Sequence, residues 1–337
     1  MCSVFTYLVH CIVVVFFVGI TLARADGETH CARVRDSLFT PAEILRSVTL
    51  KDQWCSILPL YNRGVCPVGG HQHFNMLGPI GPRCKLPLES YGTGDFEKRV
   101  CGLKILQQET ADHKCIVIGV GSNNEWDFEE SIYDKTNCKI ITLDCYYNNA
   151  TVPPRIRDRT TFMPVCLGAR DANERGPHDK PDASGFFKLR PFITYATLLD
   201  RLGLKHSPTF LKMDIEGFEY EVVGSILQNK DLLPLQIAME IHNHRGRDLP
   251  HLLNVIHGGG YDLIDRHDNP FCDACSEVVI AKTRCEGDRI SNLNTYCGTR
   301  RHEGQISNYS AIWEASKDNT HFHDCVTKIL KQLNAHY

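Results

Sequence analysis

Two carboxylates stand directly after an apolar run in the stretch FLKMDIEGFEYEVV, residues 210–223. Asp214 and Glu216 end the run, and Gly217 then begins a pattern that is typical of a helix. Residues i and i+2 of a strand point to one side, so both carboxylates are expected to face the same way. Because open α/β sheets bind ligands at the carboxyl ends of their central strands, we predict a ligand site here. The alternative is that Asp214 only caps the following helix.

A glycine turn follows another apolar run, CIVIGV at 115–120. The turn contains Gly119 and Gly121, and such a turn between a strand and a helix lets the backbone approach a nucleotide closely. Asp144 ends the next apolar run, where a carboxylate can accept hydrogen bonds from ribose hydroxyls. Together these features predict a nucleotide site. The alternative is a tight turn and an unrelated surface aspartate.

The kind of nucleotide follows from what the turn lacks. A dinucleotide fingerprint requires a third glycine at position 124, which is Asn124, so a pyrophosphate cofactor and a nicotinamide oxidoreductase are disfavoured. S-adenosylmethionine has no phosphates and fits better, with its amino-acid part at the turn and its ribose at Asp144. Methyl transfer is an in-line displacement from a sulfonium, so positioning supplies much of the rate. Asp214 and Glu216 would position the cationic donor or the acceptor's hydroxyls.

A third polar strand end is AMEIHNH at 238–244, where Glu240, His242 and His244 fall on one side. A hydroxyl acceptor must lose a proton as it attacks, and histidine is the commonest base at neutral pH. We predict that His242 is this general base. The alternative is a histidine that is simply hydrogen-bonded in a loop.

The elements that must position these residues alternate along the chain. Continuous apolar strands between amphipathic helices predict a doubly wound α/β fold with a mostly parallel sheet. The last two strands have no helix between them and are expected to form an antiparallel hairpin near one edge. The expected strands are 115–120, 139–144, 162–168, 209–214, 235–241, 261–266 and 277–283, and the helices 127–136, 194–202, 217–229 and 247–257.

The flanking regions are organised differently. Thr40-Pro41-Ala42-Glu43 is typical of a helix start, and residues 64–94 are rich in Gly, Pro and Cys. A further helix is expected from Asp95 through 108, and a final one in CVTKILKQL. The expected organisation is a signal peptide at 1–25, a Cys/Gly/Pro-rich region at 26–95, an α/β domain at 96–285 and a tail at 286–337.

The N-terminus predicts export. Its apolar run ends in Ala23-Arg24-Ala25, a pattern typical of signal-peptidase cleavage. The alternative is an uncleaved signal anchor, because the run is just long enough to span a tilted bilayer. Either way, the rest of the chain is expected in the secretory lumen or outside the cell, with no stable membrane partner unless the leader is retained. Glycosylation acceptors at Asn149 and Asn308 agree.

Net charge and cysteine content indicate which ligands and partners the chain is expected to lack. The net charge is −3, which argues against a nucleic-acid partner. The 16 cysteines predict disulfides in an oxidising compartment, although Cys115 and Cys166 could be free and buried. Cys272 and Cys275 are expected to form a disulfide with each other or with Cys285 and Cys297, rather than to bind zinc, so no metal is assigned.

These features resemble the FkbM-type methyltransferase family. The most specific signature is Lys-x-Asp-x-Glu-Gly-x-Glu, and the order of the surrounding motifs agrees over about residues 96–285. The segment NEWDF is similar to the animal branch of secretory methyltransferase-like proteins. The signature matches Lys212, Asp214, Glu216, Gly217 and Glu219.

The resemblance implies a Rossmann-like fold, S-adenosylmethionine as cofactor and O-methylation of a small-molecule or glycan hydroxyl. It carries a site role onto Asp214 and Glu216. Gly119 stands where the family's loop has an acid, for which Glu125 or Asp127 is the alternative. The competing hypothesis is a secreted non-catalytic binding or structural protein on a methyltransferase scaffold. The implied cofactor-binding residues are Gly119, Gly121, Asn123 and Asp144.

Overall fold

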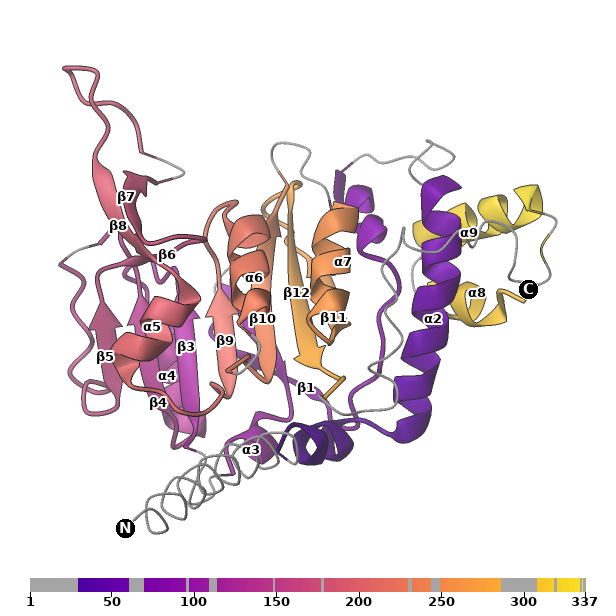
Figure 1. Cartoon of the computed structure of the whole chain (residues 1–337), viewed down its shortest axis with the longest axis horizontal. Helices are drawn as coiled ribbons and strands as arrows, with labels where there is room; N and C mark the ends of the chain where they lie inside the picture. The colour runs from indigo at the N-terminus through magenta and orange to yellow at the C-terminus, as the bar shows by residue number, and fades with distance from the viewer. Residues whose placement is uncertain are drawn as a thin grey trace, which may run out of the picture.

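The computed structural model describes residues 30–60, 70–94, 97–108, 114–147, 149–176, 179–229, 232–243, 249–285, 308–317, 320–333 and 335. The expected signal peptide, Asp95, His244 and Cys297 lie outside these residues. At the centre is a seven-stranded sheet in the order β11-β12-β10-β9-β3-β4-β5 (Figure 1).

The sheet has the predicted architecture. The strands from β10 to β5 in this order pair in parallel, whereas β12 pairs antiparallel with both β10 and β11. The expected hairpin at one edge is therefore confirmed, and β3 and β9 lie side by side. The bounds are β3 Ile116–Val120, β4 Lys139–Leu143, β5 Thr160–Met163, β9 Phe210–Met213, β10 Gln236–His242, β11 Tyr261–Asp268 and β12 Cys275–Lys282.

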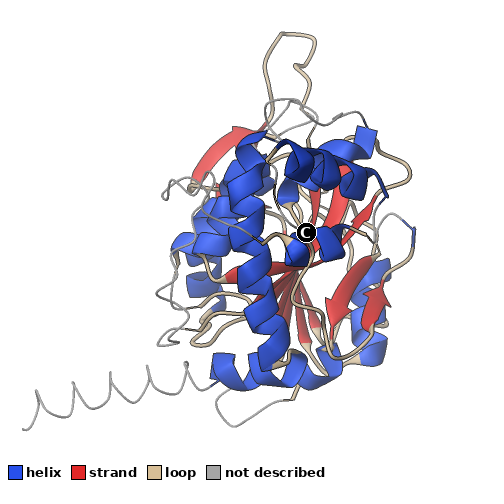
Figure 2. Cartoon of the chain, turned by 90° about the vertical axis from the view of Figure 1, so that its right-hand side faces the viewer, coloured by secondary structure: helices blue, strands red, loops and turns tan. Residues whose placement is uncertain are grey.

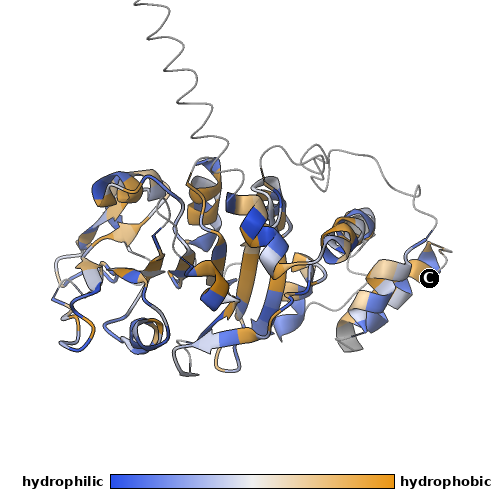
Figure 3. Ribbon diagram, turned by 90° about the horizontal axis from the view of Figure 1, so that it is seen from below, coloured by the Kyte–Doolittle hydropathy of each residue, from blue (hydrophilic) through white to orange (hydrophobic). Residues whose placement is uncertain are grey.

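Both faces of the sheet are buried because side chains alternate along each strand. Ile118 and Val120 belong to a core that includes α5 (Tyr195–Leu202), α6 (Glu219–Gln228) and α7 (Leu249–Gly258). Val117 and Ile140 belong to the opposite core, with α4 (Asp127–Lys135), β1 (Leu88–Tyr91) and β2 (Lys98–Cys101). The hydrophobic colour of the central strands in Figure 3 reflects this double burial. Because both faces are packed, the strands can hold side chains in fixed positions at their carboxyl ends.

The helix-start prediction at Thr40 is confirmed. The Thr40 hydroxyl accepts a hydrogen bond from the backbone N–H of Glu43 at 3.1 Å, and α2 begins at Pro41 (Pro41–Leu60). Helix α2 packs in one cluster with α8 (Ser310–Ser316) and α9 (Thr320–Gln332). These elements lie beyond the hairpin edge of the sheet, at the right of Figure 1 and facing the viewer in Figure 2. The N-terminal and C-terminal regions therefore support the sheet together.

The helix expected from Asp95 to 108 is wrong within the described residues. Lys98–Cys101 is the strand β2, and only Leu103–Leu106 is helical, as α3. The Gln236 side chain bonds both backbone groups of Cys101, and Gly102 is left-handed at φ 65°. A long-range contact has overridden the local helix pattern.

The strand expected at 162–168 is divided. Its first residues belong to β5, and Cys166–Leu167 form β6 in a separate three-stranded sheet. That sheet is completed by β7 (Ala172–Arg175) and β8 (Leu189–Ile193), which the sequence did not predict because Pro191 interrupts the β8 pattern.

The disulfides correct one expectation. Cys115 and Cys166 are not free, because each forms a disulfide, and Cys272 pairs with Cys275 rather than with Cys285. Among the described residues, none of the helices has the length and apolar character needed to cross a bilayer. The disulfides that can be described are Cys31–Cys285, Cys84–Cys101, Cys115–Cys138, Cys145–Cys166 and Cys272–Cys275.

Candidate active site

A pocket of about 550 Å³ opens at the carboxyl ends of β3, β4, β9 and β10. It brings together Gly121, Asp144 and Asp214, which come from three different strand ends. Gly119 and His242 are not among its lining residues. The polar lining includes Asn123, Glu216 and Glu240, and the apolar lining includes Val120, Leu143, Val165, Leu167, Phe192 and Phe218.

Gly121 is required where the glycine turn meets the end of β9. Its φ is +79°, and a β-carbon there would lie 1.8 Å from the carbonyl oxygen of Asp214. The Asp214 N–H also donates to the carbonyl of Val120 at 3.0 Å. No other residue type fits this turn without moving one of the two backbones.

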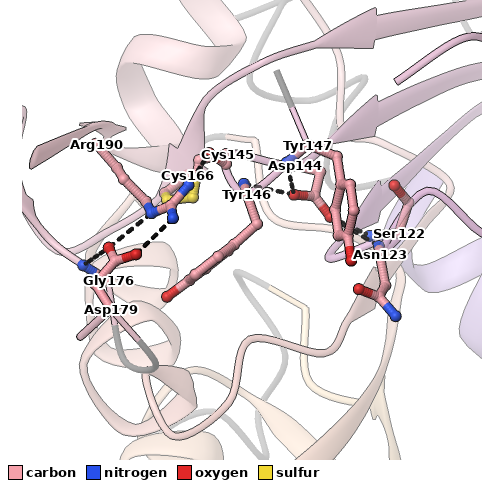
Figure 4. Close-up of a disulfide and its surroundings, with 10 residues drawn as sticks. All are labelled: Ser122, Asn123, Asp144, Cys145, Tyr146, Tyr147, Cys166, Gly176, Asp179 and Arg190. Atoms are coloured by element: carbon pink, nitrogen blue, oxygen red, sulfur yellow. Dashed lines mark hydrogen bonds and ion pairs between the residues drawn. A yellow bond between two sulfur atoms is a disulfide. The ribbon is translucent and has the colours of Figure 1, made fainter. Parts of the chain in front are cut away.

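Asp144 organises the turn through its carboxylate (Figure 4). One oxygen accepts the N–H groups of Ser122 at 3.1 Å and Asn123 at 2.7 Å. The other accepts the N–H groups of Tyr146 at 2.7 Å and Tyr147 at 3.2 Å. A carboxylate offers about four acceptor positions. Ribose hydroxyls would therefore compete with the protein's own backbone for Asp144.

Gly119 makes room for a side chain of the protein itself. A β-carbon at this position would lie 2.8 Å from the Oε1 atom of Glu129, which is buried and accepts a hydrogen bond from Thr142 at 3.0 Å. The carboxylate that lies beside Gly119 thus comes from Glu129 of α4. Burial raises the pKa of Glu129, and the charge of Lys212 opposes the rise. Sequence reasoning missed Glu129 because its partner at 119 has no side chain.

Lys212, the lysine of the signature, stabilises the glycine turn by hydrogen bonds to its backbone. Its ammonium donates to the carbonyls of Val120 (3.3 Å) and Gly121, and the side chain is buried. Burial lowers the pKa of Lys212, while the charges of Asp214 and Glu129 work against it. A buried cation with charged and carbonyl partners is tolerated where an isolated one would not be.

An aromatic wall closes the side of the pocket next to β4. The guanidinium of Arg190 stacks 3.8 Å from the centre of the Tyr146 ring and donates to Asp179 at 2.7 Å and to the Cys145 carbonyl at 2.6 Å (Figure 4). The hydrogen bond from Arg190 lowers the pKa of the Asp179 carboxyl. The Cys145–Cys166 disulfide joins this wall to β6. No motif signalled this network, because its members are far apart in the sequence.

Carboxylates surround His242 at the ends of β9 and β10. Its Nε2 atom lies 3.4 Å from Glu216, 3.4 Å from Glu240 and 4.0 Å from Asp214, and its Nδ1 atom lies 3.0 Å from Glu219. We call these five residues the His242 cluster. Glu216 reaches it through a left-handed backbone at φ 58°, a strained conformation for a non-glycine residue. The predicted residues Asp214, Glu216 and His242 are thus brought together.

The cluster changes the charge expected for His242. Burial lowers the pKa of the imidazole, but the hydrogen bond to Glu219 and the charges of Glu219, Glu240 and Asp214 outweigh it and raise the pKa to about 9. An imidazolium has no lone pair with which to accept a proton, which opposes the predicted base role at neutral pH. Burial and the charge of Asp214 raise the pKa of Glu240 to about 7. Glu240 lines the pocket, whereas His242 lies behind it.

The architecture defines a Rossmann-like α/β protein with a ligand pocket at the carboxyl ends of its parallel strands. Residues 170–263 match the family model described as the Methyltransferase FkbM domain. The match includes the signature and confirms the resemblance over this stretch. FkbM methyltransferases use S-adenosylmethionine, in agreement with the expected cofactor. No curated protein matches the chain.

Solved structures of methyltransferases are similar at a low level. The 1,6-didemethyltoxoflavin-N1-methyltransferase of Burkholderia thailandensis, bound to S-adenosylhomocysteine, is 12% identical, with 50% of this chain and 71% of that chain covered and a TM-score of 0.29. The methyltransferase FkbM of Methylobacillus flagellatus is 18% identical, with 50% and 44% covered and a TM-score of 0.31. The strand order, rather than these similarities, defines the fold class.

Proposed function

We propose that this chain is an S-adenosylmethionine-dependent O-methyltransferase that acts on a hydroxyl of a small molecule or glycan, in the secretory lumen or outside the cell. The observation that carries the proposal is a single pocket lined by the glycine turn, by Asp144 and by the carboxylates after β9. The pocket thus combines the glycine turn and Asp144, where the methyl donor would bind, with the carboxylates after β9, where the acceptor hydroxyl would bind. The match to a methyltransferase domain over 170–263 supports the same reaction class.

The described residues fit the proposed donor. Gly121 lets the turn and the end of β9 meet in backbone contact at the pocket, and Tyr146 lines the same pocket. The pocket volume of about 550 Å³ lies within the range of small-molecule and cofactor sites. When bound, S-adenosylmethionine supplies an electrophilic methyl group. Asp214 and Glu216, which also line the pocket, would supply negative charge that stabilises the sulfonium.

The acceptor end is defined by the carboxylates that line the pocket. Glu216 is partly exposed, and its oxygen can accept a hydrogen bond from an entering hydroxyl. Glu240 is buried, lines the same pocket and is held by a hydrogen bond from Asn269 at 2.6 Å. Because both residues line the pocket, we assign the acceptor's proton to Glu216 or Glu240. His242 then acts by orienting these carboxylates.

The secretory location is supported by the covalent structure. Disulfides form in oxidising compartments, and those of this chain connect regions as distant as Cys31 and Cys285. Asn149 and Asn308, the expected glycosylation sites, are both exposed. An exposed acceptor is the physical requirement for glycosylation.

A second candidate, a non-catalytic binding or structural protein, is favoured by one observation. All four acceptor positions of Asp144 are directed at backbone N–H groups. A turn whose backbone N–H groups are bonded to Asp144 in this way could serve folding alone.

Donor binding tests the proposal. Calorimetric titration of the protein from a secretory host with S-adenosylmethionine and S-adenosylhomocysteine is expected to give saturable binding. Transfer of radiolabelled methyl groups to glycans and small alcohols is then expected to fall in Glu216→Gln with donor affinity kept. Lack of donor binding at millimolar concentration would exclude the enzyme and support the non-catalytic protein.

A further inference from the structure

The CxxC motif at 272–275, a pattern typical of metal sites, does not form one here. Cys272 and Cys275 are bonded to each other and offer no thiolate. The geometry points instead to a divalent transition-metal site in the His242 cluster, formed by Asp214, Glu216 and His242. The inference rests on the proposed function only for the role of the ion in catalysis.

The spacing of the three ligand atoms suits a cation. The side-chain oxygens of Asp214 and Glu216 and the Nε2 atom of His242 all lie within 4.8 Å of one another. The two distances from Nε2 are 3.4 Å to Glu216 and 4.0 Å to Asp214. Ligands bound about 2.1 Å from a metal lie roughly 3 to 3.5 Å apart. Only a small closure of the side chains would complete the site.

His242 is oriented as metal-binding histidines are. Its Nδ1 atom lies 3.0 Å from Glu219, which is fully buried in the first turn of α6. In metal sites the second ring nitrogen donates to a carboxylate in this way, which directs the other lone pair at the ion. With Nδ1–H bonded to Glu219, the Nε2 atom faces the oxygens of Asp214, Glu216 and Glu240.

The charges around the site independently call for a cation. Glu277 pairs with Glu240 across β12 and β10, and the buried Oε2 atoms of Glu219 and Glu277 have no hydrogen-bond partner among the described residues. The cations packed on the same side are Lys98, which contacts Glu277 at 2.6 Å and Asp214 at 3.7 Å, and Lys212. Five acidic side chains therefore outnumber the three basic ones, Lys98, Lys212 and His242. Buried charge is costly unless it is compensated.

The ligand types indicate which ion would bind. Carboxylate oxygens with one imidazole nitrogen suit Mn²⁺ or Zn²⁺, whereas Ca²⁺ takes oxygen ligands. Cys275 lies within reach of His242 and Glu240, but its disulfide with Cys272 removes the thiolate that would favour Zn²⁺. Mn²⁺, the more oxygen-preferring of the two ions and one that electron paramagnetic resonance detects directly, is the ion with which we test the site.

The ion would serve the acceptor side of the reaction. A divalent ion at Glu216 would bind the acceptor oxygen and lower its pKa. The oxygen–carbon bond forms as the sulfur–carbon bond of the donor breaks, and the hydroxyl proton leaves to Glu240 or to solvent. This place for the ion agrees with the lining of the pocket by Asp214, Glu216 and Glu240.

Direct titration with Mn²⁺ tests the inference without any methyl transfer. The full chain from a secretory host is freed of metal with a chelator and titrated with Mn²⁺, and the free ion is followed by electron paramagnetic resonance. Saturable binding is expected, with an affinity about 10-fold or more lower in His242→Asn and in Glu216→Gln. His251→Asn, an exposed histidine of α7, is the matched control and should bind like the unaltered protein.

The outcomes separate this inference from the proposed function. Donor titration is repeated with chelator and with Mn²⁺, and thermal unfolding shows that each variant is folded. Donor binding without Mn²⁺ binding would overturn the metal site and leave the methyltransferase standing. Mn²⁺ binding without donor binding would support the metal site and overturn the proposed methyltransferase. Mn²⁺ affinity unchanged in both folded variants would also overturn the site.

Discussion

The carbonyl oxygen of Asp214 occupies the space that a β-carbon on Gly121 would need, at 1.8 Å. The glycine turn after β3 and the end of β9 are therefore in backbone contact. Any change that separates them alters the pocket, because both residues line it.

Gly121→Ala is expected to weaken donor binding by about 10-fold or more and to lower the free energy of unfolding by about 1–3 kcal/mol. The added methyl meets the Asp214 backbone, and φ +79° is unfavourable for alanine. Calorimetry and urea unfolding measure the two effects. Gly203→Ala is the matched control, because Gly203 has φ +62° with nothing within 4 Å of the added carbon. Equal donor binding in both variants would contradict the proposed placement of the donor at this turn.

Asp144→Asn is expected to lower the free energy of unfolding by about 1–3 kcal/mol, since an amide group would face two of the four backbone N–H groups. Donor affinity should fall with it, through the turn. Differential scanning fluorimetry and donor titration check both effects. Asp134→Asn, a half-exposed carboxylate of α4, serves as the control. An unchanged melting temperature would show that the hydrogen bonds of Asp144 do not stabilise the turn.

Replacement of both Cys145 and Cys166 by serine is expected to cost about 3 kcal/mol of stability, the magnitude typical of a closed loop of this length. Donor binding should weaken as well, because both sulfur-bearing residues line the pocket. Replacement of both Cys84 and Cys101 opens a loop of similar length that does not line the pocket. This control should lose stability and keep its donor affinity. Equal donor affinity in the two double variants would count against the assigned pocket.

Acid is expected to destabilise the chain through His257. Burial and the charge of Lys51 outweigh the attraction of Asp262 and lower the pKa of His257 to about 4. Below pH about 6.5 the unfolded state takes up the proton first, so stability falls from there to pH 4, by up to about 3 kcal/mol. Urea unfolding across this range measures the slope.

His257→Gln should flatten that slope, because glutamine can keep the donation to the Tyr261 carbonyl, 3.1 Å from Nδ1 in the native chain, without titrating. A slope that remains in this variant would assign the effect to other groups.

The strands and helices of the sheet could be predicted from the sequence because the patterns that indicate them are local. Continuous apolar runs, Thr40 before Pro41, and the glycine that ends α5 at position 203 each act within a few residues. The helix expected from Asp95 was wrong because Gln236, far away in the chain, holds Cys101 in a strand.

The residue types of the site were set by the sequence alone: a glycine turn, an acid after β4, and two acids after β9. Their roles depend on tertiary contacts. Only the folded chain places Glu129 beside Gly119, directs four backbone N–H groups at Asp144 and surrounds His242 with carboxylates. Charge and hydrogen bonding depend on distance in space, and the pairs that decide them come from separate strand ends. Spacing along the chain could name these residues but could not reveal which of them meet.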